Sequence, residues 1–137
     1  MRIAVIDGQG GGIGKAIIDR VRKEFRDSID IIALGTNALA TFAMVKAGAN
    51  EGATGEYAIA YNVSQVDYIA GSLSIIVPNS MLGELTPQIA AAIANSKARK
   101  MLLPIHRNNI DVIGLKAEPL PHLIDRLLAQ IKKYMEG

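Results

Sequence analysis

The chain has 137 residues, of which 50% are hydrophobic and 4% aromatic, with a formal net charge of +2 and no cysteine. This length fits one domain with a sizeable hydrophobic core. Without cysteine there are no disulfides, no thiolate metal ligands and no thiol nucleophile. The basic residues are scattered and no aromatic platform accompanies them, so nucleic-acid binding is not expected.

The N-terminal half of the chain predicts an alternation of strands and helices. A β-branched run predicts the first strand, and the spacing of Ile13, Ile17 and Val21, four residues apart, predicts a helix behind it. Gly35-Thr36-Asn37 can cap a second helix, which Gly48 would end. The expected elements are a strand over 2–6, a helix over 12–25, a strand over 29–34, a helix over 38–46, a loop over 48–55 and a strand over 57–61.

The C-terminal half continues the alternation. The expected elements are a helical turn over 64–67, a strand over 73–77, a helix over 86–96, a strand over 101–105, a strand over 110–115 that forms a hairpin or an edge, and a helix over 122–134. The basic cluster over 97–100 is expected in the last turn of a helix. Apolar strands that alternate with helices predict one α/β domain of three layers, a mostly parallel sheet with helices on both faces.

A glycine-rich stretch, Asp7-Gly-Gln-Gly-Gly-Gly-Ile-Gly-Lys15, lies between the first strand and the first helix. Glycines let the backbone approach an anion, and the first turn of a helix offers free N–H groups to it. A nucleotide or another phosphorylated small molecule is therefore the expected ligand. Asp7 either accepts hydrogen bonds from the amides of this loop or takes part in chemistry.

The spacing of the glycines excludes two common nucleotide-binding motifs. Position 13 is Ile, which breaks the pattern G-x-G-x-x-G, and position 16 is Ala, which breaks the P-loop pattern. Glycine at 8, 12 and 14 does fit Gly-x-x-x-Gly-x-Gly, and in this the loop resembles the cofactor loop of short-chain dehydrogenases. The resemblance implies a Rossmann-like fold and NAD or NADP as cofactor.

In a parallel sheet the loops after the strands meet at one edge, where ligands bind. The segments after the predicted strands are polar or glycine-rich. The candidate cofactor-binding residues are Gly8, Gln9, Gly10, Gly11, Gly12, Ile13, Gly14, Thr36, Asn37, Asn79, Ser80 and Arg107. No Asp or Glu ends the second strand, where NAD-selective folds place a carboxylate for the ribose, and this omission favours NADP slightly.

No complete catalytic set is visible. The Tyr-x-x-x-Lys pair of short-chain dehydrogenases is absent, and two histidines with scattered carboxylates form no metal site. One alternative to a binding protein is an enzyme acting on a phosphorylated or carboxylated metabolite, with Asp7, Glu51 or His106 as the acid–base group. Residues 50–56 around Glu51 form either a lid or ordinary turns. His122, at a helix start, is expected to be structural.

A third alternative is a structural subunit. The small-residue face over 90–94 would suit a homodimer. The first strand begins at once, which leaves no room for a signal peptide, and no apolar stretch reaches the ~18 residues of a membrane span. We therefore expect a cytoplasmic protein that has no membrane partner.

The chain as a whole resembles an uncharacterised group of small proteins that is common in anaerobic Gram-positive bacteria and is known only as a domain of unknown function. The resemblance covers nearly the whole chain. It rests on the strings Asp7–Gly14, Ala33–Thr41, Ala47–Glu56 and Asn79–Glu84. It implies no activity, substrate or catalytic residue.

Overall fold

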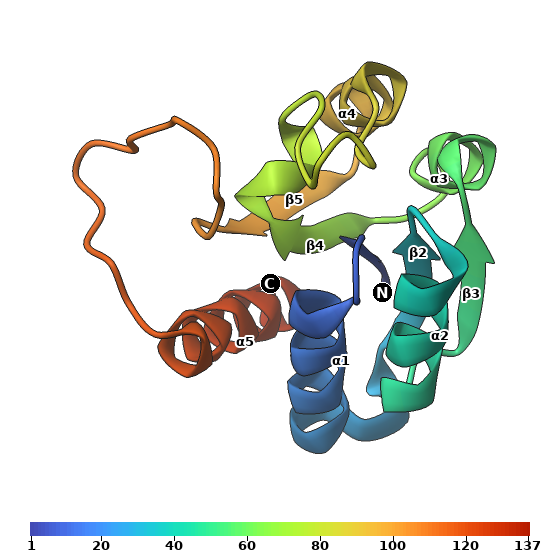
Figure 1. Cartoon of the computed structure of the whole chain (residues 1–137). Helices are drawn as coiled ribbons and strands as arrows, with labels where there is room; N and C mark the ends of the chain where they lie inside the picture. The colour runs from blue at the N-terminus through green and yellow to red at the C-terminus, as the bar shows by residue number, and fades with distance from the viewer.

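The computed structural model describes residues 1–137 as a three-layer α/β domain around one sheet (Figure 1). All five strands are parallel, and they follow the order β3-β2-β1-β4-β5. The strands are β1 (Arg2–Asp7), β2 (Asp30–Gly35), β3 (Glu51–Thr54), β4 (Tyr68–Ser72) and β5 (Arg99–Leu103). This confirms the predicted Rossmann-like architecture.

Helices cover both faces of the sheet. The helices are α1 (Gly12–Phe25), α2 (Ala38–Ala47), α3 (Glu56–Asn62), α4 (Pro87–Asn95) and α5 (Leu120–Glu136). One core cluster joins one face of the sheet to α1, α2 and α5, and a second joins the other face to α3 and α4. The strand residues therefore alternate between two cores, which explains why their sequences are apolar throughout. No helix of the structure combines the length and the apolarity needed to cross a membrane.

The first part of the chain follows the prediction closely. The helix α1 has the expected bounds, and the side chain of Asn37 caps α2 by accepting a hydrogen bond of 2.9 Å from the N–H of Ala40. Thr86 caps α4 in the same way, through the N–H of Ile89 at 3.1 Å. These caps satisfy N–H groups that have no partner inside the helix.

The prediction was wrong between 48 and 62. The expected loop contains β3, and the expected strand over 57–61 is part of α3. The strand β3 forms because it pairs with β2, and glycine at 52 lets α2 pack closely on it, since a Cβ there would lie 2.5 Å from the side chain of Val45. In α3, Ile59 is buried while Tyr57 and Tyr61 are exposed, which is helical rather than alternating burial.

Three other expectations failed in the second half. The strand expected over 73–77 is instead a 3-10 helix over 73–76, and the strand of this region is β4, over 68–72. The basic cluster over 97–100 leads into β5, because α4 ends at Asn95. Residues 110–115 form no strand, and the segment 104–119 runs away from the body of the molecule before α5 begins (Figure 1). The face over 90–94 that was predicted for a dimer is partly buried within the domain, since Ala90 and Ile93 belong to its core.

Candidate functional site

The candidate site lies where the order of the strands changes direction. The chain runs outward from β1 to β2 and β3 and then returns to the other side of β1 as β4. Ligands of open α/β sheets bind at this switch point, outside the carboxyl ends of the strands. A cavity of about 500 Å³ is present there. It is lined by Asp7, Gln9, Ile13, Ser72, Ser74, Asn79, Ser80, Met81, Leu82, Ile105, His106, Arg107 and Asn108.

The carboxylate of Asp7 holds the two ends of the glycine loop together. Asp7 is only 6% exposed, and it accepts hydrogen bonds of 2.8 Å from the N–H groups of Gly8 and Gly14. Burial raises the pKa of Asp7, the negative charge of Glu84 adds to this, and the loop N–H groups oppose it. Of the two roles that the sequence allowed for Asp7, the structure shows the hydrogen bonds to the loop.

Two N–H groups of the glycine loop have no acceptor in the protein. They belong to Gly10 and Gly12, and nothing lies within 4 Å of a Cβ built at either residue. By contrast, a Cβ at Gly14 would overlap the side chain of Met44, and Gly11 has a positive φ of 74° beside the backbone of Ala40. Gly11 and Gly14 therefore serve the packing of α1, whereas Gly10 and Gly12 leave their N–H groups free for a ligand.

Glu84 reaches the loop from the segment after β4. Its Oε1 accepts hydrogen bonds from the N–H of Gln9 at 2.8 Å, the hydroxyl of Thr36 at 2.7 Å and the side-chain amide of Asn37 at 2.8 Å. Burial raises the pKa of Glu84, but these three hydrogen bonds together outweigh burial and hold the pKa below its ordinary value. The Oε2 atom accepts no hydrogen bond from the protein.

The side chains of Thr36 and Asn37 thus donate their hydrogen bonds to Glu84, a residue that was not among the site residues predicted from the sequence. Glu84 is 48 and 47 residues away from them in the chain, so no local pattern connects the three. The only available signal was that the polar segment 79–84 follows the strand predicted over 73–77, as the glycine loop follows the first strand.

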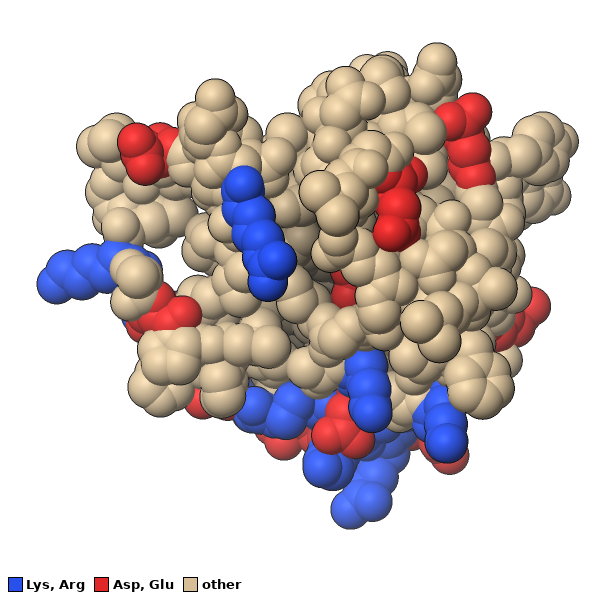
Figure 2. All heavy atoms as spheres, viewed as in Figure 1, with Lys and Arg blue, Asp and Glu red and all other residues tan.

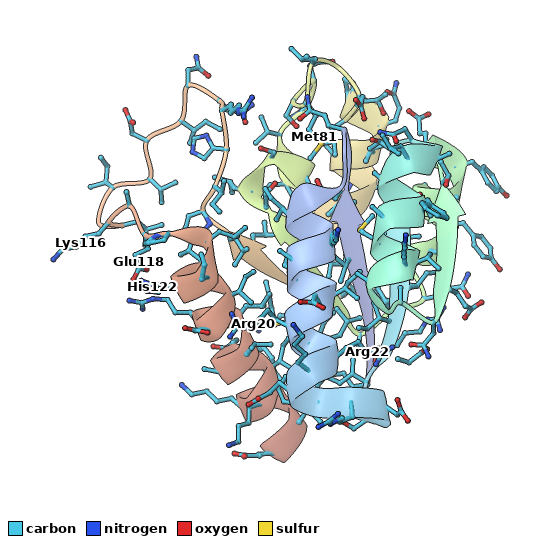
Figure 3. The ribbon with its side chains drawn as sticks, turned by 60° about the horizontal axis from the view of Figure 1, so that its bottom comes forward. Arg20, Arg22, Met81, Lys116, Glu118 and His122 are labelled. Carbon is cyan, nitrogen blue, oxygen red and sulfur yellow. The ribbon has the colours of Figure 1, made fainter.

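The segment that carries Glu84 forms a tight turn beside the glycine loop, where a Cβ at Gly8 would lie 2.7 Å from the sulfur of Met81. Asn79 and Met81 have positive φ angles of 65° and 58°, and Ser80 pairs with Leu85 in an isolated bridge. The buried hydroxyl of Ser80 donates to the backbone oxygen of Ser74 at 2.6 Å. Figure 3 shows Met81 near the carboxyl end of β1, at the cavity wall. The turn therefore has a defined shape, and the side chain of Ser80 supports it.

The far wall of the cavity follows β5. The N–H of Asn108 donates to Nδ1 of His106 at 3.1 Å, and Ser74 donates to the side chain of Asn108 at 3.3 Å. Nδ1 of His106 is therefore a hydrogen-bond acceptor, while Nε2 has no partner in the protein. Arg107 forms no salt bridge, so its charge is available to an anion in the cavity.

The charges of the surface are unevenly distributed. Figure 2 shows most of the Lys and Arg side chains gathered along the lower edge of the molecule, with acidic side chains among them, whereas the charged side chains around α3 and α4 are acidic. A hollow separates the segment 104–119 from the rest of the molecule in this view, and one basic side chain lies over it.

Other candidates lie outside the site. Glu51 binds Arg2 at the opposite, amino-terminal edge of the sheet, so it is not close to Asp7 or His106. Residues 50–56 form neither a lid nor simple turns, because β3 pairs with β2 and Glu56 begins α3. The side chain of Asn50 also accepts a hydrogen bond from the N–H of Ile31 in β2. His122 lies at the start of α5, far from Met81 (Figure 3). No group of three or more His, Asp or Glu side chains is placed to hold a metal ion.

Residues 2–136 match the model of the family described as "Domain of unknown function (DUF3842)", and the chain belongs to this family. No protein with a curated description and no solved structure matches the chain significantly.

Proposed function

We propose that this protein binds a nucleotide of the NAD(P) type across its glycine loop. The observation that carries this proposal is the cavity at the switch point of the sheet, bordered by a glycine loop with two N–H groups that no protein atom uses. A cavity of about 500 Å³ lies within the range of small-ligand sites.

Phosphate oxygens would accept hydrogen bonds from the N–H groups of Gly10 and Gly12. The positive end of α1 favours an anion at the same place, and Arg107 would supply a full charge from the opposite wall. Asp7 and Glu84 add negative charge near the loop, so the ligand must place its phosphates toward Gly10, Gly12 and Arg107. The base or nicotinamide part would then enter the cavity, beside His106 and Asn108.

We further propose that Glu84 selects an unphosphorylated ribose. In NAD-binding folds a carboxylate at the end of the second strand accepts a hydrogen bond from the ribose hydroxyl, and a 2′-phosphate is excluded there. Here Glu84 stands at that end of β2, held by Thr36 and Asn37, with Oε2 free. This supports NAD over NADP, the reverse of the slight preference that the sequence suggested.

Thermal unfolding of the protein with NAD, NADH, NADP, NADPH, AMP and inorganic phosphate tests the proposal. A ligand present at ~100 times its dissociation constant adds about 2.7 kcal/mol to the stability of the folded state. We expect NAD or NADH to raise Tm more than NADP or NADPH. If no nucleotide raises Tm, the proposal is wrong, and a shift with phosphate alone would replace it with a simple anion site.

A matched pair of variants locates the ligand. No protein atom lies within 4 Å of a Cβ built at Gly12, so Gly12→Val should fold, and its side chain should cover the free N–H groups and abolish the nucleotide shift. Ala91→Val places the same side chain at an exposed position of α4 and should leave the shift unchanged. Equal shifts in both variants would place the ligand elsewhere.

A second candidate function is an enzyme that acts on a phosphorylated or carboxylated metabolite. It is favoured by one observation, that Asp7, with a raised pKa, and His106, with an unpartnered Nε2, line the same cavity. Incubation with NAD and pools of sugar phosphates and hydroxy acids, followed by NADH absorbance, tests this reaction class. A real activity should be lost in His106→Ala while the nucleotide shift in Tm is kept.

A further inference from the structure

The strand β3 forms an unprotected edge of the sheet. It pairs only with β2, so half of its backbone N–H and C=O groups face outward. Three of its four residues, Gly52, Ala53 and Thr54, have small side chains, and the charged one, Glu51, is bound to Arg2. Soluble proteins usually guard such edges with lysine, proline or a bulge.

The other edge of the sheet is guarded. The edge strand β5 begins with Arg99 and Lys100, and charged side chains of this kind prevent the pairing of edges between molecules. The contrast between β5 and β3 within one sheet indicates that the unprotected edge of β3 takes part in an interaction.

Apolar side chains flank β3 on both faces of the sheet. Phe42 of α2 is 64% exposed, and Tyr57 and Tyr61 of α3 are 83% and 56% exposed. The two tyrosine rings stack at a centroid distance of 6.5 Å. Leu39 and Val45 extend the exposed surface of α2, whose opposite side is buried in the core. A helix that is apolar on all sides is normally buried on all sides.

The exposed area is large for a monomer. At about 200 Å² for each aromatic side chain, Phe42, Tyr57 and Tyr61 alone expose about 400 Å². This area, divided between the two faces of the sheet, is about half of the ~800 Å² that each partner buries in a standard interface. Aromatic residues are also the type enriched in such interfaces.

We propose that two copies of this chain associate through the β3 edge, with the two β3 strands antiparallel about a two-fold axis. The five-strand sheets then form one continuous sheet, with α2 against α2 on one face and α3 against α3 on the other. A two-fold interface brings the same surface together from both copies, and this edge is self-complementary. With the axis at Gly52 or Ala53, Glu51 faces Ala53 or Gly55 of the other copy, so like charges do not meet.

Sedimentation velocity over a wide range of chain concentrations tests this assembly. We expect a species of about 29 kDa, twice the 14.6 kDa of one chain. Phe42→Glu should give the monomer, and it should fold, because the side chain is exposed and the new carboxylate stands four residues before Lys46 on α2. Ile113→Glu, at an exposed position in the segment 104–119, is the matched control and should remain a dimer.

Hydrogen exchange then shows whether β3 lies in the interface. The outward-facing amides among residues 51–54 should exchange slowly in the wild type and quickly in Phe42→Glu, while the amides of β1 should remain slow in both. A monomeric wild type at every concentration would overturn the proposal, and so would a dimer that Ile113→Glu dissociates and Phe42→Glu does not. A larger complex formed only with another protein would also overturn it, because the occupant would then not be a second copy.

Discussion

Replacing Glu84 tests whether its carboxylate holds the glycine loop in place. In Glu84→Ala the N–H of Gln9, the hydroxyl of Thr36 and the amide of Asn37 lose their shared acceptor. Water can reach this half-buried site, so each lost hydrogen bond costs about 0.5–1 kcal/mol rather than the larger values for charged acceptors. The total is about 2 kcal/mol, and at ~4 °C per kcal/mol for a domain of this size, Tm should fall by about 8 °C.

The variant Glu84→Gln separates charge from hydrogen bonding. It keeps an oxygen acceptor, so we expect about half of the loss seen in Glu84→Ala at neutral pH. Because the folded state lowers the pKa of Glu84 below 4.5, the stabilisation by its charge is complete above that pH and is lost as the pH falls through the lowered pKa. The Tm difference between the wild type and Glu84→Gln, followed by circular dichroism, should therefore shrink in acid. An unchanged Tm in Glu84→Ala, or a Tm difference that does not depend on pH, would refute this account.

Three further predictions concern the same edge of the sheet. Burial raises the pKa of Asp7 above 3.8, so ionising this carboxyl destabilises the folded state. The wild type should therefore lose stability relative to Asp7→Asn as the pH rises from about 4 through the raised pKa. Parallel curves of Tm against pH for the two proteins would contradict this. Gly14→Ala brings a methyl group against the side chain of Met44 and should cost about 1–3 kcal/mol by chemical denaturation. The same substitution should cost less in a chain that already carries Met44→Ala, and an equal cost in both chains would contradict the overlap. Arg107→Ala should leave the Tm of the free protein within about 1 °C of the wild type, because surface substitutions rarely change stability. It should reduce the Tm shift caused by nucleotide, because Arg107 lines the cavity. An undiminished shift would exclude this arginine from the site.

Sequence reasoning succeeded where the determinants of structure are local. The strand β1, the glycine loop and α1 follow one another, and periodicity, glycine content and burial all indicate the same structure. The caps at Asn37 and Thr86 are local as well. The hydrogen bonds of Asp7 to the loop could be anticipated because the partners lie within seven residues of it.

The failures arise where distant parts of the chain decide the outcome. The strand β3 has weak local preference for extended structure and exists because it pairs with β2 and leaves space for Val45. The role of Glu84 depends on the turn over 79–85 crossing above β1 to the end of β2, which no periodicity can indicate. Residues 110–115 have the composition of a strand but find no neighbouring strand to pair with.

The single oxygen that Gln9, Thr36 and Asn37 share has a consequence for how the protein folds. It joins segments that are up to 75 residues apart in the chain, and these segments follow three different strands. Contacts across such long loops form late, after β1, β2 and β4 have come together. The site should therefore be absent from every partly folded form, and a ligand that binds it would report the completed fold and protect the chain from local opening at this edge.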